Sequence, residues 1–381
     1  MHGYTSVTAA SYDVVIVGVG IVGAACADQL ARRGMSVAIV DREMVGAGAT
    51  AAGMGHIVVM DDSEAQFALT RYSQLLWQEL RPELPDDVEY EPCGTIWIAA
   101  DDEEMAEVWR KREYYSQRGV PSEVLDAQTL QRLEPNLRPM AGGLLVSEDA
   151  VLYPPCAARF FSERAQAHGA KLFLGDSAAK IGQGRVHLTN GLQLSAEVVV
   201  NAAGACASDL TPGLEIKKRK GHLVITDRYP GFIRHQLVEL GYLKSAHSVT
   251  SDSVAFNVQP RRTGQALIGS SRQHGAEHKE VDNEILVRML KRAQEYIPSL
   301  AQLSSVRTWT GFRAATPDKL PLIGPWPADK TLFLATGHEG LGITTSVGTA
   351  RLLADHITGA TPEIPMEPYL PSRAAKAEVH A

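Results

Sequence analysis

The apolar positions near the start of the chain follow two different spacings. Residues 14–17 form a continuous apolar run, which is typical of a strand buried on both faces of a parallel sheet. Small and apolar residues then recur at helical spacing, and Gly34 follows as glycine often does after the last turn of a helix. A second apolar run, 37–40, ends on Asp41. This order predicts a strand, a helix and a second strand parallel to the first.

The first strand breaks into a turn that carries Gly18, Gly20 and Gly23 in a Gly-x-Gly-x-x-Gly pattern. In such a turn the first glycine permits the sharp bend, the second lets the backbone approach a pyrophosphate, and the third lets helix and strand pack closely. The N–H groups at the start of the helix favour phosphates, and Asp41 is placed to accept hydrogen bonds from a ribose. The pattern therefore predicts a dinucleotide site rather than a chance glycine turn.

The rest of the chain changes from mixed helices and strands to a strand-rich stretch. Helices are predicted at 63–80, 101–117, 154–168, 282–296 and 343–357. Strands are predicted at 95–99, 144–147, 171–174, 186–188, 193–200, 254–260, 266–270, 305–310 and 332–335. The strands at 254–260, 266–270 and 305–310 differ from the opening α/β pattern and indicate a second domain. Residues 362–371 are expected to be extended, with flexible tails at 1–11 and 372–381.

Composition narrows the class of protein. The chain has 381 residues, 45% of them hydrophobic and 21% charged, which suits a globular protein of two domains. Its net charge of −7 argues against nucleic acid or an anionic membrane surface as a partner. No apolar stretch is long enough to cross a bilayer and no secretory signal is visible, so a cytoplasmic location is expected. The four cysteines lie far apart without a Cys-x-x-Cys, so no metal site is expected.

Residues 42–56 form a loop made mostly of Ala and Gly. A loop this poor in large side chains lets a bulky ligand lie against its backbone, whereas a flexible surface loop is the alternative. Thr50 could bond a phosphate in that loop, and His56 could sit near a ring system. Two later segments add similar features, because the strand at 193–200 runs into a second glycine turn and residues 336–342 lead into a helix N-terminus.

Together these segments resemble the D-amino-acid oxidase, glycine oxidase and sarcosine oxidase superfamily of FAD enzymes, over nearly the whole chain. The motifs that carry the resemblance are 18–23 with Asp41, 49–54, 199–205, 311–324 and 337–340. Members usually carry Glu where this chain has Asp41, which shortens the reach by one carbon and keeps the acceptor. The variants at 53–56 and 337–342 are most similar to bacterial D-hydroxyproline dehydrogenases. The catalytic subunits of hydrogen cyanide synthase and opine oxidase are close relatives of these.

The resemblance implies FAD as the cofactor and hydride transfer from the substrate α-carbon to flavin N5. Sarcosine oxidases often link the flavin to a cysteine near the position of Arg313, and this chain has none there, so the FAD is expected to be non-covalent. The residues expected to hold it are Gly18, Gly20, Ile21, Val22, Gly23, Asp41, Arg42, Ala49, Thr50, Ala51, Gly53, Met54, Gly55, Ala203, Gly204, Gly337, Gly340, Leu341, Gly342, Ile343 and Thr344.

The same resemblance implies an α/β fold in which a Rossmann-like FAD-binding domain is interleaved with an α+β substrate domain on an antiparallel-rich sheet. The expected FAD-binding segments are 12–90, 145–215 and 317–371. The expected substrate-domain segments are 91–144 and 216–316.

Arg313 matches the family position for binding the substrate carboxylate, which a forked cation pairs best. His338 and Glu339 could contact the flavin or the substrate amine, and helix capping by Glu339 is an equal alternative. Phe256 could wall the pocket or belong to the core. The further pocket candidates are His56, Tyr153 and Tyr242.

The implied reaction is oxidation of a D- or secondary amino acid to the imine, with cis-4-hydroxy-D-proline as the expected substrate. A glycine or sarcosine oxidase that uses oxygen, or the FAD subunit of a hetero-oligomeric amine dehydrogenase, is the alternative. A nicotinamide-dependent Rossmann enzyme is disfavoured by the glycine turn after 193–200 and by segment 337–342. The electron acceptor stays open between oxygen, a quinone and a partner subunit. A quinone would bring the chain to the inner face of the membrane, and the chain could assemble with copies of itself or with another subunit.

Overall fold

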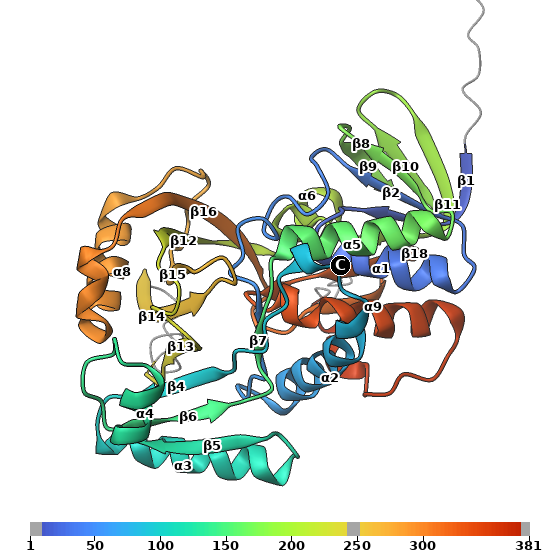
Figure 1. Cartoon of the computed structure of the whole chain (residues 1–381). Helices are drawn as coiled ribbons and strands as arrows, with labels where there is room; N and C mark the ends of the chain where they lie inside the picture. The colour runs from blue at the N-terminus through green and yellow to red at the C-terminus, as the bar shows by residue number, and fades with distance from the viewer. Residues whose placement is uncertain (1–9, 242–251, 375–381) are drawn as a thin grey trace, which may run out of the picture.

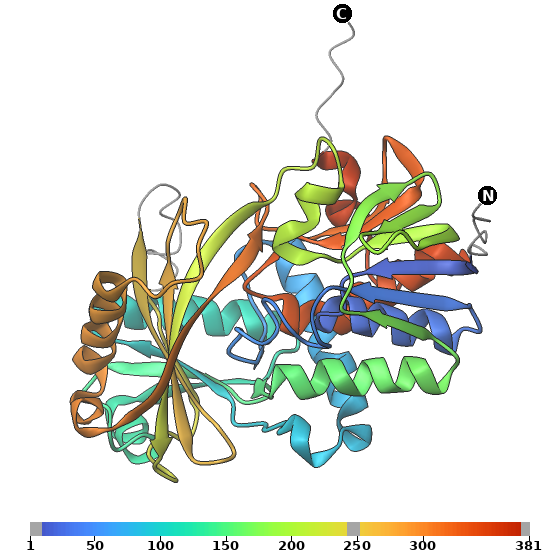
Figure 2. The same cartoon turned by 90° about the horizontal axis from the view of Figure 1, so that it is seen from above.

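The computed structural model describes residues 10–241 and 252–374. These residues form two large sheets that lie side by side, each with helices packed against it (Figures 1 and 2). The expected mixed α/β architecture is confirmed. Across the described ranges, every helix falls short of the length and apolar character that a bilayer crossing requires. Within the same ranges, no group of three His, Cys, Asp or Glu side chains is arranged to bind a metal ion.

The first sheet has a parallel centre that begins with the glycine-turn unit. Its parallel strands, in spatial order, are β18 (Asp329–Thr336), β11 (Gln193–Asn201), β1 (Ala10–Val17), β2 (Val37–Asp41) and β8 (Lys171–Leu174). Antiparallel additions are β17 (Leu322–Trp326) beside β18, and the pair β9 (Ala178–Gly182) and β10 (Arg185–Leu188) beside β11. The buried apolar runs of β1 and β2 therefore lie in the middle of the sheet, where both faces are covered.

One face of the first sheet is covered by a layer of helices (Figure 1). The layer consists of α1 (Ile21–Arg32), α5 (Pro154–Ala167), α9 (Gly342–Thr358) and α2 (Glu64–Leu80), with α1 between α5 and α9. The small residues of α1 suit this position, since nine of its twelve residues are buried and none of those nine is bulkier than Leu or Ile. Close packing of α1 brings its N-terminus to the carboxyl edge of the sheet.

The second sheet has nine strands and is mostly antiparallel. In spatial order they are β19 (His338–Glu339), β16 (Ser305–Ala315), β12 (Lys217–Arg228), β15 (Gln265–Arg272), β14 (Ser253–Pro260), β13 (Gln236–Glu239), β4 (Thr95–Ala99), β6 (Gly142–Val146) and β5 (Ser122–Asp126). Only β13 and β4 pair in parallel among the described strands of this sheet. The small pair β3 (His56–Ile57) and β7 (Ala150–Val151) lies apart from both large sheets.

The two faces of the second sheet differ in chemistry. One face is apolar and packs on α8 (Asn283–Tyr296), with Phe256 and Ile268 in its core. Two further helices, α3 (Asp102–Gln117) and α4 (Ala127–Leu133), contact the β5–β6 end. Residues of the opposite face, among them Trp97 and Asn257, line a cavity toward the first sheet. The second sheet therefore separates a hydrophobic layer from the cavity, and it forms the floor of that cavity.

The structure corrects several expectations about the elements. Residues 362–371 are not simply extended, because they include the short 3-10 helix η5 (Glu367–Tyr369) and the start of η6 (Pro371–Arg373). Arg373 lies in the expected C-terminal tail, yet it pairs with Asp318 and bonds the carbonyls of the adjacent turn. At the other end, residues 10 and 11 already belong to β1. The remaining tail residues, 1–9 and 375–381, lie outside the described ranges.

Two expected segment boundaries also differ from the sheets. Residues 145 and 146 were expected in the FAD-binding part, but they complete β6, which pairs with β4 and β5 in the second sheet. β19 was likewise expected in the FAD-binding part, but it pairs with β16. Several strands had no clear sequence signal, and β12 is one of them. The division into two interleaved domains stays a proposal.

Candidate active site

A cavity of about 490 Å³ opens between the two sheets. It is lined by the glycine turn after β1, the loop after β2, the carboxyl ends of β11 and β18, and the cavity face of the second sheet. Of the residues expected to hold FAD, those that line the cavity are Gly18, Gly20, Ile21, Val22, Asp41, Arg42, Ala49, Thr50, Gly53, Met54, Ala203, Gly204, Gly337, Gly340, Leu341, Gly342 and Ile343. Segments far apart in the sequence thus meet around one space.

The other four expected residues do not line the cavity. Gly23 and Gly55 lie behind the lining, where a Cβ would stand 2.0 Å from the carbonyl oxygens of Gly18 and Leu152, respectively. Thr344 is buried behind it as well, and its hydroxyl donates to the carbonyl oxygen of His56 at 2.8 Å. Ala51 is exposed. The first three therefore shape the cavity from behind.

The glycine turn is shaped by close backbone contacts. Gly18 has a φ of +108°, and a Cβ on it would lie 2.5 Å from the carbonyl oxygen of Ala202 on the neighbouring strand end. Only glycine tolerates both conditions. Gly20 precedes α1 and offers no side-chain cap, and Thr50 supplies one instead, since its Oγ1 accepts from the Ile21 N–H at 3.0 Å. The loop after β2 is thereby tied to the helix N-terminus.

Asp41 closes the same turn. Its Oδ2 accepts from the Val19 N–H at 2.7 Å, and its Oδ1 accepts from the Glu43 N–H at 2.9 Å. Each carboxylate oxygen keeps a further lone pair, and the residue lines the cavity. Asp41 therefore fixes the turn while facing the space where a ribose would lie.

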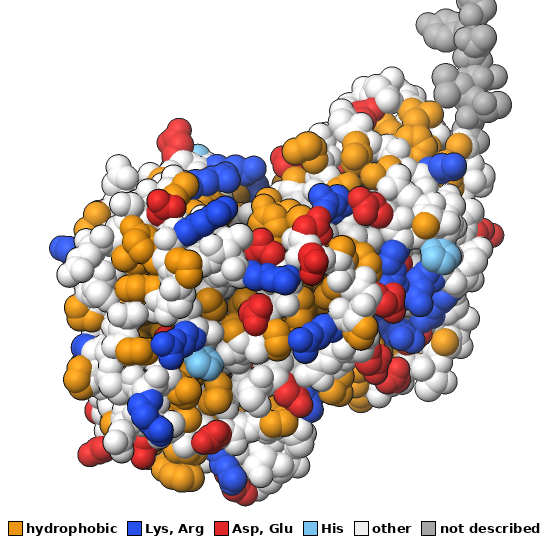
Figure 3. All heavy atoms as spheres, viewed as in Figure 1, with side chains coloured by type: hydrophobic (Ala, Val, Ile, Leu, Met, Phe, Trp, Pro, Cys, Tyr) orange, Lys and Arg blue, Asp and Glu red, His pale blue; other side chains and the backbone are white. Residues whose placement is uncertain are grey.

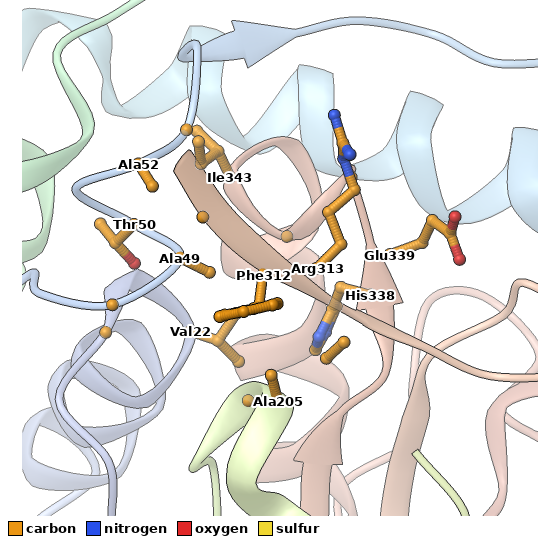
Figure 4. A pocket seen from close by; sticks show the side chains of 18 of the residues that line it. Val22, Ala49, Thr50, Ala52, Ala205, Phe312, Arg313, His338, Glu339 and Ile343 are labelled. Carbon is orange, nitrogen blue, oxygen red and sulfur yellow. The ribbon is translucent and has the colours of Figure 1, made fainter. Parts of the chain in front are cut away.

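These contacts fit an FAD molecule. The turn brings bare backbone and the positive end of α1 to one end of the cavity, as a pyrophosphate requires. At the far end α9 begins without a side-chain cap, so a second positive helix end meets the cavity. Figure 4 shows Ala49, Thr50 and Ala52 on one side of this space, with Arg313, His338 and Glu339 on the other.

Arg313 reaches the cavity from β16. Its Nη1 donates to the carbonyl oxygen of Ser271 at 2.9 Å. The guanidinium lies against Gly221, where a Cβ would stand 2.6 Å from Nη1 and 2.9 Å from Cζ. Gly340 borders the Nε side, where a Cβ would lie at 3.5 Å. The fork is therefore held flat on a strand that has no side chain at this point, with its position set by backbone atoms.

His56 lies near Arg313 and is held in one tautomer. Its Nδ1 lies 2.8 Å from Oε1 of Gln236, and since that oxygen can only accept, the proton sits on Nδ1. Burial lowers the pKa of His56, and the nearby positive charge of Arg313 lowers it too, against the effect of the Gln236 bond. His56 is therefore a neutral ring whose Nε2 carries a lone pair beside the cavity.

His338 and Glu339 lie at the turn between β18 and α9. Nε2 of His338 bonds the hydroxyl of Thr349 at 2.9 Å, and burial lowers the pKa of this ring to about 3. Glu339 does not cap α9, so that alternative is wrong. Its Oε1 instead pairs with Nη1 of Arg219 at 2.5 Å, and both side chains are nearly buried. Both residues line the cavity, with Glu339 already committed to an ion pair.

The structure moves two other candidates away from the cavity. Phe256 is fully buried on the α8 face of the second sheet and stacks on Tyr296 at 4.3 Å, so the core alternative holds. Tyr153 is 40% exposed, under the guanidinium of Arg261. Tyr242 lies outside the described residues. Residues that sequence reasoning missed include Gln236, Asn257 and Ser271, and an isolated glycine within a strand, Gly221, was the available signal for this place.

The fold and the cavity together define an FAD-dependent oxidoreductase that acts on amino groups. The family model described as DAO, FAD dependent oxidoreductase, matches residues 13–356, and the chain belongs to that family. Glycine oxidase of Geobacillus kaustophilus is 28% identical over 374 residues, covering 94% of this chain and 96% of the relative. Hydrogen cyanide synthase subunit HcnC of Pseudomonas aeruginosa is 28% identical over 417 residues, covering 95% and 96%.

The solved structures agree with these relatives. The crystal structure of glycine oxidase from Geobacillus kaustophilus superposes with a TM-score of 0.85 at 27% identity, covering 95% of this chain and 98% of that one. The cofactor expected from the sequence, FAD, and the expected enzyme class are therefore confirmed.

Proposed function

We propose that this protein oxidises a D- or secondary amino acid to the imine, with cis-4-hydroxy-D-proline as substrate. The observation that carries the proposal is Arg313, whose guanidinium lies flat over Gly221 at the cavity and is fixed by the carbonyl oxygen of Ser271. A forked cation held in place on bare backbone suits a carboxylate. The carboxylate would anchor the substrate at the end of the cavity away from the glycine turn.

The chemistry divides between cofactor and chain. Bound FAD supplies the acceptor for a hydride from the substrate α-carbon. The chain orients the substrate through Arg313 and offers the lone pair of His56 Nε2 to the amine N–H. As the hydride leaves, the C–N bond becomes double and the amine proton departs, so a neutral acceptor near the nitrogen favours the step. The Nδ1 bond to Gln236 keeps His56 in the accepting tautomer.

Polar groups near His56 support a substrate that carries a hydroxyl. Gln236 and Asn257 lie on adjacent strands of the cavity floor, and both are almost fully buried. Buried amides of this kind reward a substrate that can hydrogen-bond to them. The motif variants at 53–56 and 337–342 also support this substrate, because within the family they are most similar to those of D-hydroxyproline dehydrogenases.

Similarity to glycine oxidase and HcnC supports two other readings of the same site. One is oxidation of glycine or sarcosine with oxygen as the acceptor. The other is an FAD subunit that passes electrons to a partner chain, as the name of HcnC, a synthase subunit, suggests. The acceptor would be oxygen, a quinone or that partner. All three readings keep Arg313 as the carboxylate anchor.

One experiment separates these readings. The purified holoenzyme is mixed anaerobically with cis-4-hydroxy-D-proline, D-proline, glycine and sarcosine, and flavin absorbance near 450 nm is followed. Bleaching by cis-4-hydroxy-D-proline at least tenfold faster than by glycine is expected, and preferential bleaching by glycine would refute the substrate. Reoxidation of the bleached flavin by air or by an artificial acceptor then distinguishes oxidase from dehydrogenase.

A further inference from the structure

The pairing between β12 and β15, close to Arg313, contains an irregularity. Val224 of β12 pairs with Ile268 of β15, and Lys220 pairs with Gln273. Between these two pairs β15 has one residue more than β12, which is a β-bulge. Bulges interrupt the backbone ladder and redirect the groups within them. In this bulge the carbonyl oxygen of Ser271 accepts from Arg313.

His222 lies opposite the bulge and takes the place of the missing ladder bonds. Its backbone N–H donates to Ser271 Oγ at 2.9 Å, and its ring Nδ1 lies 2.9 Å from the same oxygen. Its Nε2 accepts from the backbone N–H of Asp282 at 3.0 Å. Since Nε2 accepts, the ring proton is on Nδ1, and it donates to Ser271.

Burial and its hydrogen-bond partners hold the His222 ring neutral and in this tautomer. His222 is fully buried, and burial lowers its pKa, with the nearby charge of Lys220 acting in the same direction. Asp282 is itself fixed, because its carboxylate caps α8 through the N–H groups of Glu284 and Ile285 and accepts from Gln273. Hydrogen bonds therefore connect the start of α8 to the side chain of Ser271, and the carbonyl oxygen of the same residue holds Arg313.

We propose that His222 is a positioning residue for substrate binding, which clamps the β15 bulge so that Ser271 presents its carbonyl oxygen to Arg313. The proposal rests on the proposed role of Arg313 as the carboxylate anchor. Gly221, the residue before His222, supplies the bare surface under the same guanidinium. Two adjacent residues of β12 thus position the guanidinium. Gly221 contacts it directly, and His222, on the opposite face of the sheet, acts through Ser271.

The test compares substitutions that remove or keep the hydrogen bond between the His222 ring and the Ser271 hydroxyl. His222→Leu removes both ring bonds, whereas His222→Asn keeps a donor near the position of Nδ1. Ser271→Ala removes the acceptor and keeps the carbonyl group. The matched control is Thr226→Val, because Thr226 also joins β12 to β15 through its side chain, accepting from the Ala266 N–H at 2.9 Å, but does not line the cavity.

Binding of pyrrole-2-carboxylate, a planar carboxylate that cannot be oxidised in this way, is followed through the absorbance change of the bound flavin. We expect His222→Leu and Ser271→Ala to weaken binding at least tenfold, with FAD content unchanged. We expect His222→Asn to recover most of the affinity and Thr226→Val to retain it. If His222→Leu does not fold, Ser271→Ala carries the same expectation. Loss of less than threefold in the folded variants would overturn the proposal.

A double-mutant cycle with Arg313→Ala separates the two levels of the argument. If His222 acts through Arg313, His222→Leu weakens binding less than twofold in the Arg313→Ala background. Equal weakening in both backgrounds would overturn the positioning role alone. No effect of Arg313→Ala, or no binding of the probe to the wild type, would instead refute the proposed function on which the inference rests.

Discussion

At the residue scale, the ionisable side chains that line the cavity are held in defined charge states by burial and by ion pairing. His338 is buried and His56 is half-buried, and burial favours the neutral ring in each. Glu339 is neutralised by Arg219. Arg313 stands in register with Arg219 on the neighbouring strand, so the Glu339 ion pair also relieves a repulsion between two arginines. Arg313 therefore lies beside an ion pair rather than beside an uncompensated arginine.

Substitution of Arg313 tests its role directly. Arg313→Ala leaves the substrate carboxylate desolvated and unpaired, which costs about 2–5 kcal/mol in transition-state binding. A fall in kcat/KM of about 30-fold to several thousand-fold is expected. Arg313→Lys keeps the charge without the forked guanidinium, so its kcat/KM should lie between those of the wild type and Arg313→Ala. Steady-state kinetics measure the effect and flavin absorbance measures FAD content, which should not change. A loss of less than about threefold would place the carboxylate elsewhere.

His338 predicts a pH dependence of stability with a definite sign. Its pKa is lowered from 6.5 to about 3, so between these values the unfolded chain binds a proton that the folded chain does not. The free energy of unfolding should therefore fall as the pH drops from about 6.5 to about 3, relative to a His338→Gln variant that cannot take up this proton. Urea unfolding of both holoproteins at several pH values gives the difference. Parallel curves would show that His338 is not buried as a neutral ring.

At the element scale, the sequence predicted elements with a strong period and missed those shaped by contacts between distant strands. The helices at 64–80 and 102–117 match the predicted ones within a residue, because the first has a clear apolar spacing and the second begins with a run of acidic residues that suits a helix start. β16 was predicted only to 310, yet it continues to Ala315 and carries Arg313. Its continuation depends on pairing with β12 and β19, which no local pattern reveals. The same holds for the bulge in β15.

Two glycines with positive φ make a matched pair for testing the glycine turn. Gly18→Ala combines an unfavourable φ of +108° with a Cβ placed 2.5 Å from a carbonyl oxygen, whereas Gly34→Ala meets nothing within 4 Å at a φ of +84°. Both variants should lose stability through backbone strain, of about 1 kcal/mol. Only Gly18→Ala should also lose FAD, seen as a fall in the ratio of 450 nm to 280 nm absorbance. Equal FAD content in the two would contradict the close-approach argument.

At the scale of the whole molecule, the cavity depends on segments from every third of the chain. On the face shown in Figure 3, acidic and basic side chains are mixed over the middle of the surface. That distribution fits a small-molecule substrate better than a polyanion. The sequence could predict which segments meet, since each carries a glycine-rich motif. It could not predict the Arg219–Glu339 pair, which joins residues 120 positions apart.

The mode of FAD attachment is a property of the assembled cavity. All four cysteines carry free thiols, and the one that lines the cavity, Cys206, bonds Arg42. We expect acid precipitation of the holoprotein to release the yellow chromophore into the supernatant. Chromophore that stays with the denatured chain would show a covalent link. Apoprotein prepared under milder conditions should regain absorbance when FAD is added.

The place of β18 in the first sheet has a consequence for how the protein is made. β18 pairs with β11, and the turn that follows it leads through β19 into α9. During synthesis the chain emerges from the ribosome in order, so the glycine turn appears more than three hundred residues before this last wall of the cavity. A nascent chain therefore has no complete FAD site until β18 and α9 have emerged. Cofactor capture in this way has to wait for β18, and until then the edge of β11 that β18 covers stays open to pairing with other chains.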